Sequence, residues 1–189
     1  MNLATSDEYL NTIGHGTTYF QYWVWKNCSL DYYGFSKSNR FLSLKSTDDY
    51  CALNGYIQIP RINEDTLHEL GYTDLNINET IKSGDVFVGT PIDIGIKGIT
   101  NIYWQYKLNK QLDIECLDCT IQALCDLYPE HSASMRRYVD GTTCYQDNLF
   151  IMNHVVFNEY CSWLFDILRE VSTRLANDRN LSKLKYNVE

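Results

Sequence analysis

The sequence predicts an α/β domain in which a small mixed sheet is flanked by helices. Short β-rich segments alternate along the chain with longer segments whose apolar residues recur at helical spacing. The 189 residues are 44% hydrophobic, which suits one domain with a buried core. No repeat or low-complexity tract divides the chain. We therefore expect one domain over residues 17–175, an N-terminal extension over 1–16 and a flexible polar tail over 176–189.

The first half of the chain contains two predicted helices and two predicted strands. Segment 17–26 (TTYFQYWVWK) places Phe20 and Trp23 at helical spacing and favours a helix, although alternation suits a strand almost as well. The aromatic run DYYGF then predicts a buried strand that leads into a polar loop. Segment 56–60 (YIQIP) alternates like a short strand closed by proline. The segment INEDTLHELGY predicts a short helix that ends at Gly71.

The second half predicts two further strands and three helices. The segment GDVFVGTP predicts a strand whose residues 86–88 are buried, and NIYWQYKLN begins a helical stretch. A second helix follows in LDIECLDCTIQALCDLYPE. The strand NLFIM then precedes a long amphipathic helix from about His154 to Leu175. The apolar stripe expected on the second helix consists of Leu117, Ile121, Leu124 and Leu127.

Charge and hydropathy exclude two classes of protein. The chain has 24 acidic residues against 16 lysines and arginines, which argues against nucleic-acid binding by phosphate neutralisation. No apolar window approaches the roughly 18 residues of a transmembrane segment. The start, MNLATSDEYL, lacks the basic and apolar regions of a signal peptide. We therefore expect a cytoplasmic protein that reaches the inner face of the membrane only as a peripheral protein, through a partner.

The cysteines and histidines do not form a recognisable metal motif. Seven cysteines without an export signal indicate reduced thiols rather than a disulfide framework. Cys116 and Cys119 have the spacing of a zinc knuckle, but no second CxxC or histidine pair completes four ligands. The alternative is two thiols one turn apart on a helix. The four histidines are scattered, so we assign no metal ligands from the sequence.

Polar residues follow the first predicted strand. The chain contains no GxGxxG, GxxxxGK[ST], HExxH or GxSxG motif, which removes the commonest dehydrogenases, nucleotide hydrolases, zinc proteases and α/β-hydrolases. In the loop SKSNR, Lys37 and Arg40 can offset phosphate charge. Asn39 and the two serines can donate to phosphate or sugar hydroxyls. A solvated loop is an equally good interpretation.

Acidic residues precede two other predicted strands. Asp147 and Asn148 come directly before the apolar run LFIM. A carboxylate in this position can act as a catalytic base or metal ligand, or the two residues can simply shape a turn. Asp85, at the start of GDVFV, presents the same choice.

Four blocks in order resemble one bacterial family. The chain reads YWVWKN, then YYGF followed by a short basic motif, then GDVFVGTP, and finally DNLFIMNHVVFNEYCSWLFDIL. This order is similar to that of exopolysaccharide or capsular polysaccharide glycosyltransferases, over about residues 17–175. The resemblance implies a glycosyltransferase A-type fold, in which a nucleotide-binding sheet holds a nucleotide-sugar over an acceptor. It implies a hexosyltransferase that extends a surface glycan, with Mn²⁺ or Mg²⁺ left open as cofactor.

The resemblance also implies roles for the polar residues. Asp147 would act as the base or metal ligand, and Asn148 would orient the sugar or acceptor. The residues that would contact the nucleotide-sugar are Lys26, Arg40 and, in the loop between them, Lys37 and Asn39. From its position at the start of a strand we add Asp85 as a further candidate for this contact.

Two departures from the family favour a second hypothesis. Relatives carry His-Tyr-Arg-Arg where this chain has Lys-Ser-Asn-Arg, ending at Arg40. The chain also begins where the family has already completed a first strand and helix, so residues 3–10 or a partner would have to cover an exposed sheet edge. These departures favour a non-catalytic carbohydrate-binding or assembly subunit docked to an active glycosyltransferase. The intact DNLFIM block favours the enzyme. A fragment that folds only within a longer polypeptide is a third reading.

Overall fold

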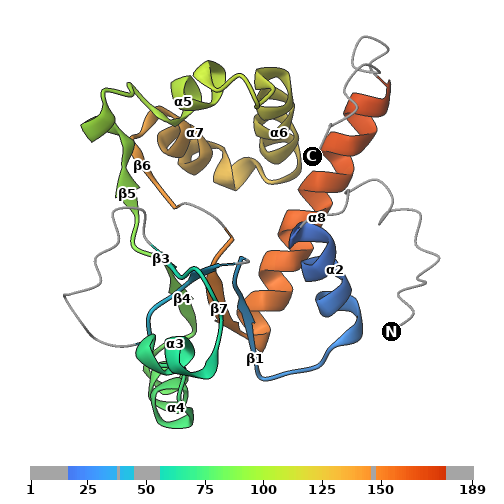
Figure 1. Cartoon of the computed structure of the whole chain (residues 1–189). Helices are drawn as coiled ribbons and strands as arrows, with labels where there is room; N and C mark the ends of the chain where they lie inside the picture. Colours follow the sequence, from blue (N-terminus) through green and yellow to red (C-terminus); the bar gives the residue numbers. More distant parts are fainter. Residues whose placement is uncertain (1–16, 38, 45–55, 146–147, 178–189) are drawn as a thin grey trace.

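The computed structural model describes residues 17–37, 39–44, 56–145 and 148–177 (Figure 1). The α-helices in this part of the chain are α2 (Thr17–Asn27), α3 (Glu64–Glu69), α4 (Asp74–Ser83), α5 (Ile102–Leu108), α6 (Ile114–Leu127), α7 (Ser132–Asp140) and α8 (His154–Asn177). Two short 3₁₀ helices are η2 (Ile94–Lys97) and η3 (Pro129–His131). The strands are β1 (Tyr32–Phe35), β2 (Arg40–Phe41), β3 (Ile57–Gln58), β4 (Val86–Val88), β5 (Ile92–Asp93), β6 (Thr143–Cys144) and β7 (Phe150–Asn153).

A three-stranded sheet in the order β1-β7-β4 forms the centre of the fold. Phe150 on β7 pairs with Phe35 on β1 and with Val88 on β4. The other described strands form two small antiparallel pairs, β2-β3 and β5-β6. Because β7 runs antiparallel to both neighbours, its beginning lies beside the ends of β1 and β4. Residues that follow β1 and β4 therefore meet those that precede β7.

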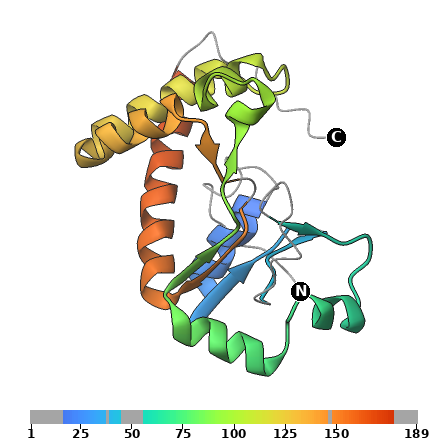
Figure 2. The same ribbon diagram turned by 90° about the vertical axis from the view of Figure 1, so that its left-hand side faces the viewer.

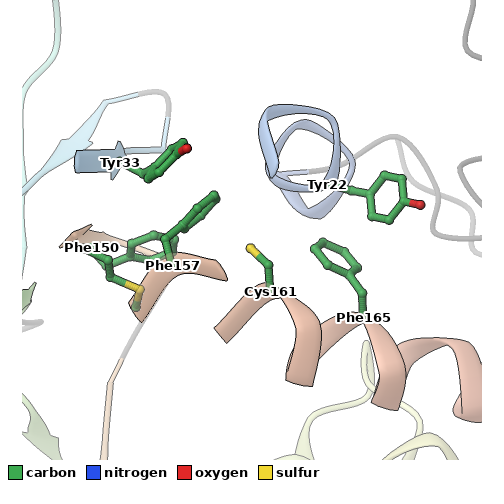
Figure 3. Close-up of a cluster of buried hydrophobic side chains, with 7 residues drawn as sticks. Tyr22, Tyr33, Phe150, Phe157, Cys161 and Phe165 are labelled. Atoms are coloured by element: carbon green, nitrogen blue, oxygen red, sulfur yellow. The ribbon is translucent and has the colours of Figure 1, made fainter. Parts of the chain in front are cut away.

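Helices α8 and α2 cover one face of this sheet, while the β2-β3 pair lies on the side away from α8 (Figure 2). The core between the sheet and these helices is rich in aromatic side chains. Figure 3 shows Tyr33 and Phe157 facing each other, with ring centroids 4.0 Å apart. Phe165 contacts Tyr22 edge to face at 4.9 Å and stacks on Trp25 at 5.6 Å.

Hydrogen bonds fix the junction between α2, β1 and α8. The Trp25 indole N–H donates to Asn158 Oδ1 at 3.0 Å, which ties α2 to α8. The His154 amide donates to the Asp31 carbonyl at 2.8 Å, so the start of α8 is held against the start of β1. These bonds explain why the tryptophan and asparagine side chains are accommodated beside an apolar core.

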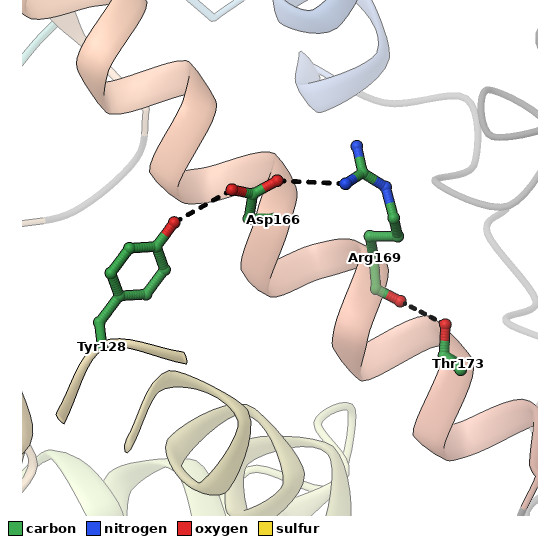
Figure 4. Close-up of polar contacts among 4 residues, drawn as sticks. All are labelled: Tyr128, Asp166, Arg169 and Thr173. Carbon is green, nitrogen blue, oxygen red and sulfur yellow. Dashed lines mark hydrogen bonds and ion pairs between the residues drawn. The ribbon is translucent and has the colours of Figure 1, made fainter. Parts of the chain in front are cut away.

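Helices α5, α6 and α7 form a second group around the C-terminal half of α8 (Figure 1). Ala123 and Leu124 on α6 pack against Ile167 and Val171 on α8. Figure 4 shows the polar side of this contact: the Tyr128 hydroxyl donates to Asp166, which also pairs with Arg169 at 3.1 Å. The α8 helix therefore joins the sheet to the second helical group.

The structure confirms the α/β class and most of the predicted elements. Segment 17–26, the YYGF and NLFIM strands and the long last helix are formed as expected. The short helix ends at Glu69 with Leu70 as its C-cap, so Gly71 lies one residue beyond the predicted cap position; there it adopts φ +84°, a left-handed conformation that glycine takes without strain. Every strand pair in the described ranges is antiparallel. None of the described helices is long and apolar enough to cross a membrane.

One burial prediction is wrong and another holds only in part. Val86 and Val88 are 43% and 47% exposed, because β4 is an edge strand and the described helices leave its side chains partly open. On α6 the predicted Leu124 is buried, but Cys116 and Ala123 are buried as well and Leu127 is 43% exposed, because α8 covers a face rotated from the predicted stripe. On α2, for which the sequence analysis used spacing alone, Phe20 is 56% exposed, whereas Gln21 and Tyr22 are buried. The sequence analysis also missed α4, α7 and the β5-β6 pair.

Burial of the Cys161 thiol predicts a loss of stability at high pH. Burial raises the pKa of Cys161 from 9.0 to about 11, and a hydrogen bond from Gln21 opposes this shift only in part. As the pH rises, the Cys161 thiol loses its proton in the unfolded chain before it does so in the folded chain. The stability that depends on the protonated thiol is therefore complete below about pH 9 and is lost as the pH approaches 11. We expect a loss on the order of 2 kcal/mol over this range in urea unfolding. The Cys161→Ala variant should not show this loss of stability between about pH 9 and 11. If the free energy of unfolding depended on pH in the same way in both proteins, the prediction would be wrong.

Candidate functional site

A buried glutamine connects α2 to the start of β7. Gln21 is fully buried among the aromatic side chains of the core. Its Oε1 accepts a hydrogen bond from Asn148 Nδ2 at 3.3 Å, and its Nε2 donates to Cys161 Sγ at 3.7 Å. The Tyr160 hydroxyl approaches Asn148 Oδ1 at 3.5 Å. Because a buried polar group without a partner costs about 1–3 kcal/mol, these contacts hold the Asn148 amide in one orientation.

A pocket of about 460 Å³ opens beside this asparagine. It lies at the end of the sheet where β4 finishes and β7 begins, and α7, α8 and Tyr145 after β6 supply the rest of its wall. Its polar and aromatic lining consists of Thr90, Tyr138, Tyr145, Asn148, Tyr160 and Trp163. The remaining lining is small or apolar: Val88, Gly89, Leu149, Phe150 and Met152. None of these residues carries a charge at neutral pH.

The hydroxyl and indole groups of the pocket remain neutral. Burial raises the pKa of both Tyr138 and Tyr160, so these hydroxyls keep their protons at neutral pH and can both donate and accept hydrogen bonds. The indole N–H of Trp163 is buried and has no acceptor among the residues that the structure describes. The pocket therefore offers neutral hydrogen-bonding groups on a largely aromatic wall.

Asn148 is the one predicted site residue that lines this pocket within the described ranges. Asp147 lies outside the described residues, and its role stays a prediction. Lys26 is exposed at the end of α2, and its Nζ lies 3.4 Å from the centroid of the Trp25 ring. This contact holds the ammonium on the surface of α2 rather than in the pocket.

The predicted basic loop follows β1 at the same end of the sheet. The backbones of Lys37 and Arg40 exchange hydrogen bonds of 2.6 and 3.2 Å, which makes a tight turn. The Asn39 carbonyl accepts from the amide of Ile59 at 2.8 Å. The Arg40 guanidinium lies 4.7 Å from the centroid of the Tyr56 ring. The loop is thus built against β3, on the side of the sheet away from α8 (Figure 2).

Tyr56 connects this loop to the start of β7. It packs in a cluster with Leu42 and Leu149, against which Ile151 also packs. Phe150 and Met152 instead belong to the core under α8. Since successive residues of a strand point to opposite faces, Arg40 and the side chains under α8 lie on opposite faces of β7.

Asp85 lies at the opposite end of the sheet from Asn148. Its Oδ1 accepts a hydrogen bond from Asn153 Nδ2 at 2.7 Å, and its carbonyl accepts from the Asn153 amide at 2.9 Å. The structure therefore does not bring Asp85 together with the other predicted residues. Its role in substrate binding stays a prediction.

The described residues do not build the carboxylate site that Mg²⁺ or Mn²⁺ requires. Over these ranges no group of three or more histidine, cysteine, aspartate or glutamate side chains could hold a metal ion. The Asp85 carboxylate is engaged by an amide, as noted above. Cys116 and Cys119 lie one turn apart on α6, the first buried and the second partly buried.

Sequence reasoning missed several residues of the pocket. Tyr160 and Trp163 lie three residues apart on α8, within the block EYCSWLF, and this spacing places them on one side of the helix. Gln21 is a polar residue inside an aromatic run on a predicted helix. A polar side chain among buried aromatics was the available signal, because burial requires it to have partners.

Comparison with known proteins identifies the family of the chain. A family model described as a domain of unknown function, DUF4422, matches residues 17–185. The chain belongs to the DUF4422 family. No curated protein matches it.

A solved structure also matches this DUF4422 chain. The apo structure of the bifunctional glycosyltransferase WbbM superimposes with a TM-score of 0.80 and 26% sequence identity over 91% of the chain. The DUF4422 chain in turn spans 30% of the WbbM chain. This match supports the expected glycosyltransferase A-type fold, and with it the resemblance to a glycosyltransferase-related family.

Proposed function

We propose that this DUF4422 domain transfers a sugar from a nucleotide-sugar to a growing surface glycan, an exopolysaccharide or capsular polysaccharide. The observation that carries the proposal is the match to a bifunctional glycosyltransferase over 91% of the chain at a TM-score of 0.80. A neutral pocket beside Asn148, at the end of the central sheet, gives further support. The protein would act in the cytoplasm, at the inner face of the membrane, through a partner glycosyltransferase or glycan carrier.

The proposed reaction needs a base for the acceptor hydroxyl and a counter-charge for the departing diphosphate. We assign the first role to Asp147 and the orientation of the sugar to Asn148. We assign the counter-charge to Lys37 and Arg40, with Asn39 as a hydrogen-bonding neighbour. The end of β1 and the start of β7 are adjacent, since Phe35 pairs with Phe150. This adjacency supports a donor and an acceptor that meet at this end of the sheet.

Lys26 and Asp85 remain in the proposal as weaker candidates for donor contacts. Lys26 is close to the Trp25 ring, and Asp85 lies at the far end of β4. Each would have to leave its present partner to reach a donor at the start of β7. The proposal therefore rests on the other residues.

One observation favours the second candidate function, a non-catalytic carbohydrate-binding or assembly subunit. The chain spans 30% of WbbM, so a relative of this fold works beside other parts of a larger protein. In that case the domain would bind sugar and dock to an active glycosyltransferase without turning over a donor.

Donor binding by Arg40 is tested by thermal unfolding in the presence of uridine, guanosine and thymidine diphosphates and their sugars, with and without Mn²⁺. We expect one nucleotide to raise Tm, because a ligand that binds only the folded state stabilises it by mass action. Arg40→Ala should weaken that binding by about tenfold or more, as loss of a charge-assisted phosphate contact predicts.

The matched control is Arg169→Ala, which removes a cation from the partly exposed Asp166 pair on α8. It should leave the nucleotide shift unchanged. Slow release of nucleotide diphosphate from the same donor would support the enzyme. Cooperative unfolding with no shift and no donor hydrolysis would contradict it and favour the assembly subunit.

A further inference from the structure

We propose that the 460 Å³ pocket beside Asn148 binds a neutral sugar ring at the end of the acceptor glycan, and not the nucleotide of the donor. The acceptor role rests on the proposed function, whereas sugar binding does not. The proposal divides the end of the sheet into two sites. The donor lies toward the loop after β1, and the acceptor lies under α7 and α8.

The described residues of the pocket lining carry no charge, which argues against a diphosphate there. Every lining side chain named above is neutral at pH 7, and burial raises the pKa of Tyr138 and Tyr160 further above the neutral range. A diphosphate in such a pocket would lose its hydration without gaining a cation. A sugar hydroxyl, by contrast, exchanges water for tyrosine and amide groups at little cost.

The aromatic lining suits a flat ring that is apolar on its faces and polar on its rim. Tyr160 and Trp163 have ring centroids 6.3 Å apart, and both contribute to the wall. Pockets of about 300–1,000 Å³ with an apolar wall and a few polar groups are typical of small-molecule sites.

The contact with Gln21 makes the Asn148 amide a fixed recognition group. Gln21 accepts from Nδ2 and the Tyr160 hydroxyl donates to Oδ1, so the second N–H hydrogen and one lone pair of Oδ1 keep capacity for a ligand. Because Gln21 is fully buried, it cannot turn away to release the amide without losing its own contacts. A preorganised donor and acceptor pair of this kind reduces the entropic cost of binding.

A nucleobase would also fit an aromatic pocket, but a diphosphate attached to it would meet no cation among the described lining residues. The Arg40 guanidinium stacks on Tyr56, which packs with Leu149. Leu149 also lines the pocket, so the cluster that holds Arg40 adjoins the pocket at the start of β7. A donor diphosphate held by Arg40 would then lie next to a sugar held in the pocket, as transfer between two substrates requires.

The test measures binding of methyl glycosides of glucose, galactose and N-acetylglucosamine to the full chain by saturation-transfer NMR. Val88→Trp adds a large side chain at the pocket, and because Val88 is 47% exposed the fold should tolerate it. Val86→Trp is the matched control on the same strand, 43% exposed and outside the lining. We expect at least one glycoside to bind, Val88→Trp to abolish that binding and Val86→Trp to retain it.

Tyr160→Phe is a second variant that preserves shape and removes one hydroxyl. It should weaken glycoside binding about five- to tenfold, as the loss of one hydrogen bond predicts. Its control is Tyr103→Phe, whose hydroxyl donates to Asp118 on α6, away from the pocket. Uridine diphosphate should not displace the glycoside from the unmodified chain.

Three results would overturn the inference: no glycoside binds, Val88→Trp and Val86→Trp behave alike, or uridine diphosphate displaces the glycoside. Donor hydrolysis, measured separately, tests the proposed function. If the chain hydrolyses the donor and Val88→Trp still binds the glycoside, the assignment of the pocket to the sugar is wrong and the proposed function stands. If the pocket binds the glycoside but the chain does not hydrolyse the donor, the sugar is not an acceptor and the domain is a carbohydrate-binding domain.

Discussion

Replacing Phe157 by alanine should destabilise the domain by about 3–5 kcal/mol, the range for a large aromatic side chain removed from a packed core. Phe157 is fully buried and stacks on Tyr33 with ring centroids 4.0 Å apart, so its truncation leaves a cavity inside the aromatic core. Urea unfolding followed by circular dichroism measures this loss as a lower midpoint at constant m-value.

Phe20→Ala is the matched control, because Phe20 is the same residue type on α2 but is 56% exposed. Phe20→Ala should lower the free energy of unfolding by only about 0.5 kcal/mol, as for most surface substitutions. Equal losses in the two variants would contradict the core described here. A broad, weakly denaturant-dependent transition in the unmodified chain would instead indicate a fragment that needs the rest of a longer polypeptide.

Replacing Asp147 by asparagine should lower donor turnover by about 100- to 10,000-fold, the usual contribution of a positioned general base. The change keeps the size of the side chain and removes its basicity. If Asp147 acts only as the base, the rise in Tm caused by the nucleotide-sugar should persist. Nucleotide diphosphate released from the donor, with and without an acceptor glycan, measures the effect.

Asp140→Asn provides the control for this variant, because Asp140 is an exposed carboxylate at the end of α7. It should turn over donor at the normal rate. Normal turnover by Asp147→Asn would assign the base to another residue. If Asp147→Asn lost both nucleotide binding and turnover, Asp147 would instead contact the donor or a metal ion.

The elements of the fold were predictable wherever local sequence patterns dominate. The helices of Thr17–Asn27 and His154–Asn177 carry apolar residues at helical spacing, and the YYGF and FIMN strands are short and aromatic. Burial was less predictable, because it depends on which neighbour covers a residue. Val86 and Val88 read as a buried strand but lie on a sheet edge. No local pattern indicates which strand will be at the edge.

The candidate site was predicted only in part for the same reason. Asn148 was found because polar residues before a strand suggest a ligand site, and it does line the pocket. The remainder of the wall comes from the end of β4, from α7, from Tyr145 after β6, from β7 itself and from α8, and several of these are far apart in sequence. Their convergence follows from the antiparallel pairing of β7 with β4 and the packing of α8. Neither is encoded in a short motif.

The central position of β7 has a consequence for synthesis of the protein. Strand β7 follows both of its partners in sequence, and β1 lies near the other end of the described chain. By the time the ribosome adds β7, β1 and β4 have emerged without the strand that joins them. Contacts of such long sequence separation form slowly. The aromatic side chains of Tyr33 and Phe35 therefore stay exposed to solvent until β7 and α8 emerge, and a chaperone that holds nascent apolar segments would act in this interval.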